Sequence, residues 1–341
     1  MSRPHEEPVE EARPAAGEAS SPQVSVIIPT SNRWPLLSSC ALPSALGQLD
    51  VEHEVIVVDD GSTDETSQLL AELEEPRLRV IRHASARGVS RARNTGIAAA
   101  RGDWLAFLDD DDLWSPRKLR TQLDRAIATD AAFVYAGAVA VDERRQLISG
   151  LALPDPESLK TRLGRGSAIP AGPSNVMVRA DVLGRVGGFD EDLSHSADWD
   201  MWIRLARDGE AAACEDVLVA RIEHRQRMLF RDRPDVTREI EDLMTKHYPD
   251  NARQPGGVDE WLAVEHFQLG FRRKAAWLFL RAAVRRRSLG NVPPAVGALF
   301  GERGMRLASK LLVASRGHSH LDSSSKTPAV EPSWLGHYRE R

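Results

Sequence analysis

Between residues 24 and 108, short apolar runs alternate with stretches of helical character. The runs are nearly continuous in apolar and β-branched residues, which is typical of strands that are buried on both faces. Such an alternation predicts an open, mostly parallel, Rossmann-like α/β sheet with right-handed crossovers and helices on its faces. The expected strands are 24–28, 54–58, 78–81 and 103–108, and the expected helices between them are 35–48, 64–74 and 88–100.

Two helix starts carry capping signals. Ser62 and Glu65 have the spacing of a capping box, which predicts side-chain hydrogen bonds at the start of the helix that follows. Ser115 followed by Pro116 predicts a helix with serine at the N-cap and proline in its first turn. Later in the chain we expect a surface loop at 150–173, a strand at 175–178 and a helix at 198–208.

The composition divides the chain into four parts. The N-terminal residues are rich in Pro, Glu and Ala and carry little to bury, which predicts a disordered tail. Further on, the pattern becomes helical with few strand signals, and the last residues are polar again. The predicted parts are a disordered tail 1–22, an α/β domain 23–235, a helical C-terminal region 236–316 and a disordered tail 317–341.

The charge and the cysteine content argue against a nucleic-acid-binding protein and against a disulfide-bonded one. The net charge of −5 gives no support to nucleic-acid binding as the main function. Cys40 and Cys214 are too far apart in sequence for a Cys-x-x-Cys metal site or a disulfide framework, so a reducing compartment is the default. We find no signal-peptide pattern and no run of about 18 apolar residues. We therefore expect a cytoplasmic protein.

Acidic clusters follow two of the expected strands. Asp59 and Asp60 end the second strand, and residues 109–112 are four consecutive aspartates after the fourth. In open α/β sheets, ligands bind at the carboxyl ends of the strands. Asp109 and Asp111 lie two residues apart, so an extended backbone points both to one side. Hard oxygen ligands of this kind suit Mg²⁺ or Mn²⁺, and the alternative is a solvated acidic turn that caps the next helix.

The first strand lacks the glycine loop that would bind phosphate groups. It ends in Pro29-Thr30-Ser31-Asn32-Arg33, without a Gly-x-Gly-x-x-Gly or Gly-Lys-Ser/Thr pattern. Phosphates bound at this sheet would therefore be neutralised by a metal ion.

Residues 22–226 resemble the family 2 glycosyltransferases, which have the nucleotide-diphospho-sugar (GT-A) fold. The resemblance rests on several motifs that occur in the family's order and spacing. They are 24–30 (VSVIIPT), 57–64 (VVDDGSTD), 88–96 (GVSRARNTG), 107–112 (FLDDDD), 187–190 (GGFD) and 198–200 (DWD).

The resemblance implies a site for the nucleotide of a sugar donor, for which we favour a UDP-sugar. Asp60 would accept a hydrogen bond from the N3–H of uracil or thymine. Arg93 would approach the nucleotide or its phosphates, and Asp109 would meet the ribose. The implied donor-binding residues are Pro29, Thr30, Asp60, Arg93 and Asp109.

The resemblance also implies a metal ion and a general base. Asp111 would bind Mg²⁺ or Mn²⁺ through the diphosphate. His224 stands where family members often carry Arg-x-His, so it would complete the metal site or touch the diphosphate. Asp198 matches the family's catalytic base, which would deprotonate an acceptor hydroxyl in an inverting transfer. Asp200, two residues later, is the second candidate for the base.

Three positions depart from the family pattern. Ser31, Ala86 and Ala197 stand where an aromatic residue or His, an Asn and a Glu are common. None of the departures removes a metal or base carboxylate, so they bear on donor preference. The chain also lacks the Gln-x-x-Arg-Trp motif of processive synthases, which indicates a single-transfer enzyme.

Residues 271–287 form a basic segment with an aromatic, apolar centre. One interpretation is a helix that lies peripherally on an anionic membrane at the inner face, where lipid-linked acceptors reside. The other, which we take as the default, is an ordinary helix packed on the catalytic domain with solvated arginines.

The sequence thus predicts an inverting, metal-dependent glycosyltransferase that acts on a hydroxyl acceptor in the synthesis of a cell-surface polysaccharide, glycolipid or glycoconjugate. The acceptor is unidentified, and a lipid-linked one is among the candidates. The alternative is a non-catalytic sugar-nucleotide-binding protein on the same fold, which would be expected to lose Asp111 or Asp198. A nucleotidyltransferase would need a Gly- and Lys-rich loop after the first strand, which is absent.

Overall fold

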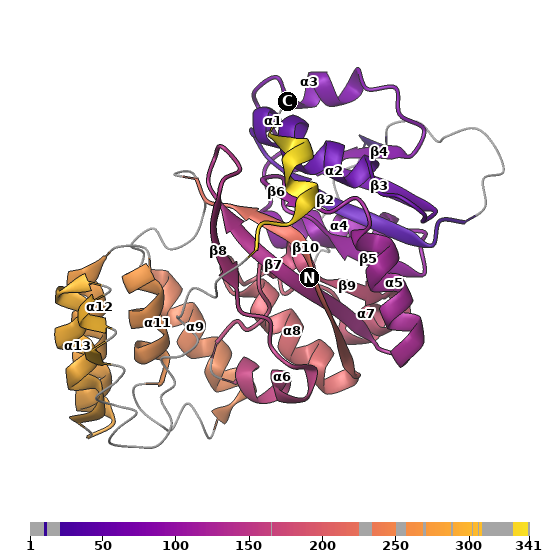
Figure 1. Cartoon of the computed structure of the whole chain (residues 1–341). Coiled ribbons are helices and arrows are strands. Elements are labelled where there is room, and N and C mark those ends of the chain that lie inside the picture. Colours follow the sequence, from indigo (N-terminus) through magenta and orange to yellow (C-terminus); the bar gives the residue numbers. More distant parts are fainter. Residues whose placement is uncertain are drawn as a thin grey trace, which may run out of the picture. The chain divides into compact units, whose positions relative to one another are not determined.

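The computed structural model describes most of the chain as two compact units (Figure 1). The first unit contains 1–157, 169–225 and 328–341, and the second contains 158–168 and 226–327. The described residues are 10–11, 21–164, 166–224, 234–249, 257–268, 271–287, 289–301, 303–305, 307–308 and 330–339.

The N-terminal half of the first unit is a parallel βα sheet, as the sequence predicts. Its four parallel strands stand in the order β4-β3-β2-β5. The strands are β2 (Val24–Thr30), β3 (His53–Asp59), β4 (Leu78–Arg82) and β5 (Trp104–Phe107). The segments between them are α1 (Trp34–Leu36), a π-helical turn (Leu37–Ala41), α2 (Leu42–Leu46), α3 (Thr66–Ala71) and α4 (Val89–Ala99).

The second half of the sheet is mixed. β9 lies between β5 and β7 and runs antiparallel to both, and β10 runs parallel to β7 and antiparallel to β6. β8 pairs with β7, and β1 (Glu10–Glu11) pairs antiparallel with β4. The remaining strands and helices are β6 (Asp112–Trp114), α5 (Lys118–Thr129), β7 (Phe133–Val141), β8 (Leu147–Leu151), β9 (Met177–Arg179), α7 (Ala180–Val186), α8 (Ala197–Asp208) and β10 (Ala211–Ile222).

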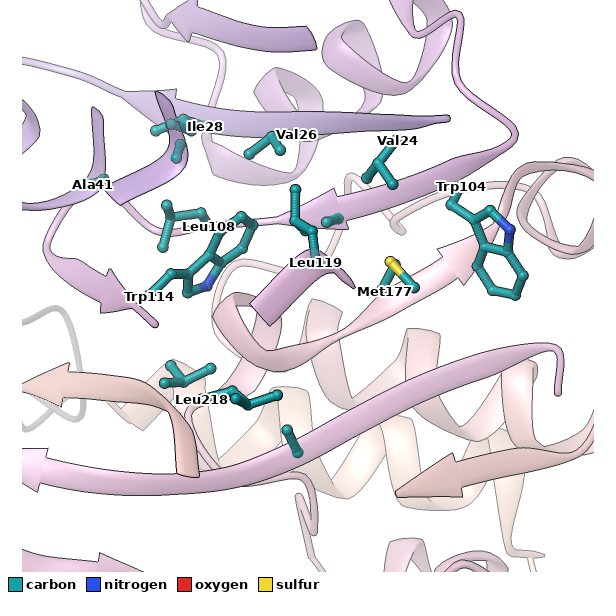
Figure 2. Packing of buried hydrophobic residues seen from close by; sticks show 14 of the residues in the cluster. Val24, Val26, Ile28, Ala41, Trp104, Leu108, Trp114, Leu119, Met177 and Leu218 are labelled. Carbon is teal, nitrogen blue, oxygen red and sulfur yellow. The ribbon is translucent and has the colours of Figure 1, made fainter. Parts of the chain in front are cut away.

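Both faces of the parallel strands are buried because successive side chains alternate between them. In β3, Val55 and Val57 join the main core cluster, whereas Ile56 and Val58 pack with Ala92 of α4 on the other face. Figure 2 shows the main cluster, in which β2 side chains lie near Leu108, Trp114, Leu119 and Met177. This two-sided burial explains the continuous apolar runs in the sequence.

The two predicted caps are not formed as expected. The N-cap of α3 is Glu65, without a side-chain hydrogen bond, because Ser62 serves the preceding turn. The Ser62 N–H donates to Asp59 Oδ1 (2.9 Å), and the Ser62 Oγ accepts the N–H of Asn32 (2.9 Å). The helix after Ser115 begins at Lys118, whose N–H donates to the Ser115 carbonyl (3.0 Å).

The stretch 150–173, expected as a loop, contains regular structure. It includes α6 (Pro156–Leu163) and the start of a 3-10 helix (Gly172–Asn175). Proline at the first position of α6 is compatible with a helix, since the N–H that it lacks would have no intrahelical partner there. The richness in Pro and Gly therefore marks the ends of short helices.

The described part of the second unit is helical, as expected for this region. α11 packs against α12, and α12 against α13. None of the described helices is long and apolar enough to cross a membrane. The elements are α9 (Pro234–His247), α11 (Gly257–Gln268), α12 (Arg272–Arg285), a 3-10 helix (Leu289–Asn291) and α13 (Val292–Leu299).

Residues 330–339 return to the first unit, in contrast to the disordered tail that the polar composition of 317–341 predicts. They carry a 3-10 helix (Ser333–Tyr338) in which Leu335 is buried. Tyr338 Oη donates to the carbonyl of Trp114 (3.0 Å), and Trp334 Nε1 donates to that of Val217 (2.8 Å). A few apolar side chains thus attach a segment whose average composition is polar.

Candidate active site

Three carboxylates meet after the carboxyl end of β5. Asp109, Asp111 and Asp112 each offer one oxygen, and these oxygens lie within 4.8 Å of one another. Carboxylate oxygens are the ligands that Mg²⁺ and Mn²⁺ prefer, so the donor set fits the ion that the sequence predicts. The acidic segment therefore converges on one point instead of forming a solvated turn.

Ser174, in the 3-10 helix Gly172–Asn175, holds this acidic segment in place. Its Oγ donates to Asp112 Oδ2 (2.6 Å) and accepts the N–H of Asp109 (3.1 Å). Its carbonyl accepts the indole N–H of Trp114 (2.6 Å), which satisfies the polar atom of a fully buried ring. Ser174 carries no motif that could have identified it from the sequence.

Asp110 is held by Thr30 and Arg33. Thr30 Oγ1 donates to its Oδ2 (2.8 Å), and Arg33 Nη1 lies 2.9 Å from its Oδ1. Burial raises the pKa of Asp110 to about 8, although Arg33 and the hydrogen bond from Thr30 favour the charged form. Thr30, predicted to line the base pocket, is thereby tied to the acidic segment.

Arg33 places a positive charge among the acids. Its Nη2 donates to Asp111 Oδ2 (2.7 Å) and lies 3.2 Å from His224 Nε2. His224 Nε2 is also 2.7 Å from the same Asp111 oxygen, so the two predicted metal ligands do meet, although 113 residues separate them. The ring nitrogen can donate to Asp111 or accept from Arg33, but not both.

The guanidinium of Arg33 competes with a divalent cation for the Asp111 carboxylate. Both groups are positive, so they repel each other when they contact the same carboxylate. We therefore expect metal binding at Asp111 to displace Arg33. Arg33 was not among the predicted site residues, although its position in the loop after the first strand was an available signal.

Arg93 and Asp109, two of the predicted donor-binding residues, form an ion pair. Arg93 Nη2 lies 2.6 Å from Asp109 Oδ1, and the guanidinium stacks 5.1 Å from the ring centre of Phe189. α4 carries Arg93 and approaches β2 closely at Gly96. A Cβ there would stand 2.5 Å from Ile27 Cγ2, so only glycine permits this separation.

Asp198 lies in the first turn of α8, near Arg93 and Asp109. Its Oδ2 would be 3.2 Å from a Cβ on Gly172, so the carboxylate lies against a stretch of backbone without a side chain. Burial raises the pKa of Asp198 to about 6; Arg93 and the N–H of Trp199 oppose this shift, whereas Asp109 adds to it. A carboxylate with this pKa is ionised at neutral pH but more basic than usual.

Asp200, the second candidate for the base, has a structural role. It is fully buried and accepts a hydrogen bond from Arg204 Nε (2.7 Å). Arg204 also donates to the carbonyls of Val186 and Gly188 (2.7 Å each). Asp200 thus orients the arginine that shapes the turn before Phe189.

Asp60 lies beside Thr30 at the end of β3. Its N–H donates to the Thr30 carbonyl (2.8 Å). Its carboxylate accepts the N–H groups of Arg87 and Gly88 (2.8 Å each) and contacts His83 Nδ1 (2.7 Å). A carboxylate oxygen can accept two hydrogen bonds, so a base could still bind, and this role stays a prediction. Pro29 is buried in β2, paired with Val58 of β3.

Comparison with known families covers the segment that contains most of this site. The family model for Glycosyl transferase family 2 matches residues 25–187, which include Arg33, Arg93 and the acidic segment. Residues 25–187 thus form a glycosyl transferase family 2 domain.

Curated relatives of this family 2 chain are bacterial. ExoO, a succinoglycan biosynthesis protein of Rhizobium meliloti (strain 1021), is 50% identical over 91 residues, or 27% of this chain and 26% of ExoO. WfgD of Escherichia coli, a UDP-Glc:alpha-D-GlcNAc-diphosphoundecaprenol beta-1,3-glucosyltransferase, is 27% identical over 190 residues, or 56% of this chain and 72% of WfgD. Chondroitin synthase of Escherichia coli is 31% identical over 207 residues, or 60% of this chain and 29% of the synthase. The chain thus spans under a third of two of these relatives.

Solved structures share the fold. TarS of S. aureus in complex with UDP-GlcNAc has a TM-score of 0.55 and 17% identity, covering 87% of this chain and 93% of that chain. The complex of TarS with UDP has a TM-score of 0.52 and 18% identity, with the same coverage. At this identity the likeness establishes the GT-A architecture of the family 2 chain and nothing about its ligands.

Proposed function

We propose that this family 2 chain transfers a sugar from a nucleoside-diphosphate sugar to an acceptor hydroxyl, with inversion and with a divalent cation. The observation that carries the proposal is the convergence of the acidic segment, Arg93, His224 and Asp198 at the carboxyl ends of the strands. Motifs that lie far apart in sequence supply the donor side, the metal side and the base.

A UDP-sugar is the favoured donor. The name of WfgD specifies UDP-Glc, and TarS was solved with UDP-GlcNAc and with UDP. In this chain Asp60, beside Thr30 and Pro29, is the group that would accept the N3–H of uracil. Arg93, held by Asp109, would then direct its charge toward the nucleotide's phosphates.

The metal site would support the leaving group. Mg²⁺ or Mn²⁺, held by Asp111 with His224 and the neighbouring carboxylates, would offset the charge that the nucleoside diphosphate gains as it departs. Arg33 lies next to this position and, once displaced from Asp111, can turn its charge toward the same diphosphate.

Asp198 would act on the acceptor. As the acceptor oxygen attacks the anomeric carbon, the bond from that carbon to the diphosphate breaks, and Asp198 takes the hydroxyl proton. Attack from the side opposite the diphosphate inverts the anomeric centre. A general base of this kind contributes about 10²- to 10⁴-fold in rate.

The names of two relatives support a lipid-linked acceptor. WfgD acts by name on a diphosphoundecaprenol-linked sugar, and ExoO is named for succinoglycan biosynthesis. We therefore place this chain in the synthesis of a bacterial polysaccharide, with a lipid-linked sugar as the favoured acceptor.

Calorimetric titration with UDP, dTDP and GDP, each with and without Mn²⁺, tests the donor site. We expect UDP to bind only with Mn²⁺, and Asp111→Asn to abolish that binding. Asp124→Asn is the matched control, because Asp124 is an exposed α5 carboxylate paired with Arg120. If UDP binds equally well without Mn²⁺ and in the Asp111→Asn variant, the proposed role of the metal ion in donor binding is refuted.

Incubation with UDP-glucose and UDP-GlcNAc, with and without a lipid-linked acceptor, then tests catalysis. Release of UDP, and an inverted anomeric configuration of the product by NMR, are the expected results. UDP binding without any UDP release would favour the non-catalytic sugar-nucleotide-binding alternative.

A further inference from the structure

An apolar stripe runs along the exposed side of α12. Trp277, Leu280 and Val284 are 52%, 46% and 76% exposed, and they are flanked by exposed Arg273 and Arg287. The spacings of four, three and four residues place Arg273, Trp277, Leu280 and Val284 on one face of the helix, and Arg287 follows just after the helix ends. The opposite side of α12 is buried through residues such as Ala275, Ala276, Leu278, Phe279, Ala282 and Ala283.

The neighbouring elements of the second unit add further exposed apolar side chains. On and after α13, Val296, Leu299, Phe300 and Leu307 are 51%, 50%, 73% and 62% exposed. A Cβ on Gly301 would be 3.0 Å from the Arg272 guanidinium, so the end of α13 lies beside the start of α12. We call the exposed side chains of 271–308 the apolar–basic surface.

The arginines in and after α12 include two groups. Arg281 pairs with Asp259, Arg285 with Glu241 and Asp259, and Arg286 with Glu260, and these pairs hold the helices of the unit together. In the part of the chain that the structure describes, Arg273, Arg287 and Arg303 have no such partner. Residues 271–308 contain nine Lys or Arg and one Glu, in a chain of net charge −5.

We propose that the apolar–basic surface docks on an anionic lipid bilayer. Exposed Trp, Phe and Leu side chains can enter the boundary between headgroups and acyl chains, while arginines meet lipid phosphates. A second copy of this chain is a poorer partner, because two such surfaces would oppose their positive charges. Packing on the catalytic unit would explain the apolar stripe but not the unpaired arginines that flank it.

The proposal does not depend on sugar transfer. It assigns to the second unit the task of holding the chain at a membrane surface, and it would stand if the catalytic assignment failed.

Sedimentation of the full chain with lipid vesicles tests this surface without any nucleotide. Vesicles of phosphatidylcholine containing phosphatidylglycerol should sediment the protein, vesicles of phosphatidylcholine alone should do so far less, and salt should weaken the binding. The double variant Trp277→Ser/Leu280→Ser should bind about tenfold or more weakly. Ile127→Ser is the matched control, because Ile127 is an exposed apolar residue on α5 (66%).

A second pair of variants tests the charge. Arg273→Glu/Arg287→Glu should lose binding by about tenfold or more, whereas Arg144→Glu, at an exposed turn of the first unit, should not. Circular dichroism identifies any variant that fails to fold. The proposal is overturned if wild-type protein stays in solution with every vesicle, if the folded variants bind as wild type does, or if the same variants dissociate an oligomer in analytical ultracentrifugation while vesicles have no effect.

Discussion

At the scale of single residues, neighbouring aspartates of similar appearance have different surroundings. Asp198 is largely buried and lies against the backbone of Gly172, whereas Asp200 is fully buried and bonded to Arg204. Both sit in the first turn of α8, and the sequence alone left the choice of base open between them. Their surroundings predict different consequences of substitution.

Asp198→Asn should lower kcat by about 10²- to 10⁴-fold while leaving the donor KM nearly unchanged, because the base acts on the acceptor. In the wild type, kcat should rise with pH through about 6 as Asp198 loses its proton, and steady-state kinetics across pH measures this.

The folded state holds the Asp198 proton more tightly than the unfolded chain, so Asp198 favours folding at low pH and loses that contribution as pH rises through 6. Asp198→Asn should therefore not lower the melting temperature at neutral pH.

Asp200→Asn should show the opposite pattern. Removing one partner of a buried ion pair costs about 3–5 kcal/mol, because Arg204 is left with an uncompensated charge. Thermal unfolding should detect a clear fall in Tm. An Asp200 variant with normal Tm and abolished kcat would reverse the assignment of the two residues.

Arg33→Gln should raise the affinity for Mn²⁺, because it removes the cation that occupies Asp111 Oδ2. Electron paramagnetic resonance of free Mn²⁺ gives the affinity without any substrate. Arg117→Gln, which removes an exposed arginine paired with Asp50, is the control. Weaker Mn²⁺ binding in the Arg33 variant would mean that Arg33 supports the metal site rather than competing for it.

At the scale of elements, the site depends on how closely α4 lies to β2. The helix carries Arg93 and Asn94, and Asn94 exchanges hydrogen bonds with the backbone of Phe189 (2.8 and 2.9 Å). The Phe189 ring packs edge-on against Phe107 of β5, with centroids 5.1 Å apart. A shift of α4 would therefore move Arg93 and the turn at Phe189 together.

Gly96→Ala should destabilise the protein by about 1–3 kcal/mol, because the added methyl would overlap Ile27. It should also weaken nucleotide binding, since α4 must move outward with Arg93. Gly184→Ala is a helical control in α7 with nothing within 4 Å of the added methyl, and it should be neutral or slightly stabilising. Chemical unfolding and nucleotide titration of both variants measure these effects, and equal stabilities would contradict the close approach.

At the scale of the whole molecule, the first unit is discontinuous in sequence. Its last part, 328–341, follows the second unit along the chain. Leu335 and Tyr338 join a buried cluster with Leu113, Val139 and Ile222. The chain thus passes through the second unit and then contributes again to the core of the first.

Leu335→Ala should destabilise the first unit by about 2–5 kcal/mol, the usual cost of truncating a buried leucine. Val330→Ala, at a side chain that is 89% exposed, is the control and should have little effect. Differential scanning calorimetry of the full chain measures both. An unchanged transition in the leucine variant would show that 330–339 contribute nothing to the stability of the sheet.

Local and periodic features of this protein were predictable from its residues alone. Strands β2, β3, β4 and β5 were predictable because apolar runs and the helices between them repeat within short windows, and the position of the acidic segment followed from the end of a strand. Which side chains meet depends instead on how distant segments pack together. Arg33 with Asp111 and His224, and Ser174 with Asp112, are contacts between distant segments that no local pattern encodes. The different surroundings of Asp198 and Asp200 likewise arise from packing, because burial and ion pairing depend on what the rest of the chain places around each carboxylate.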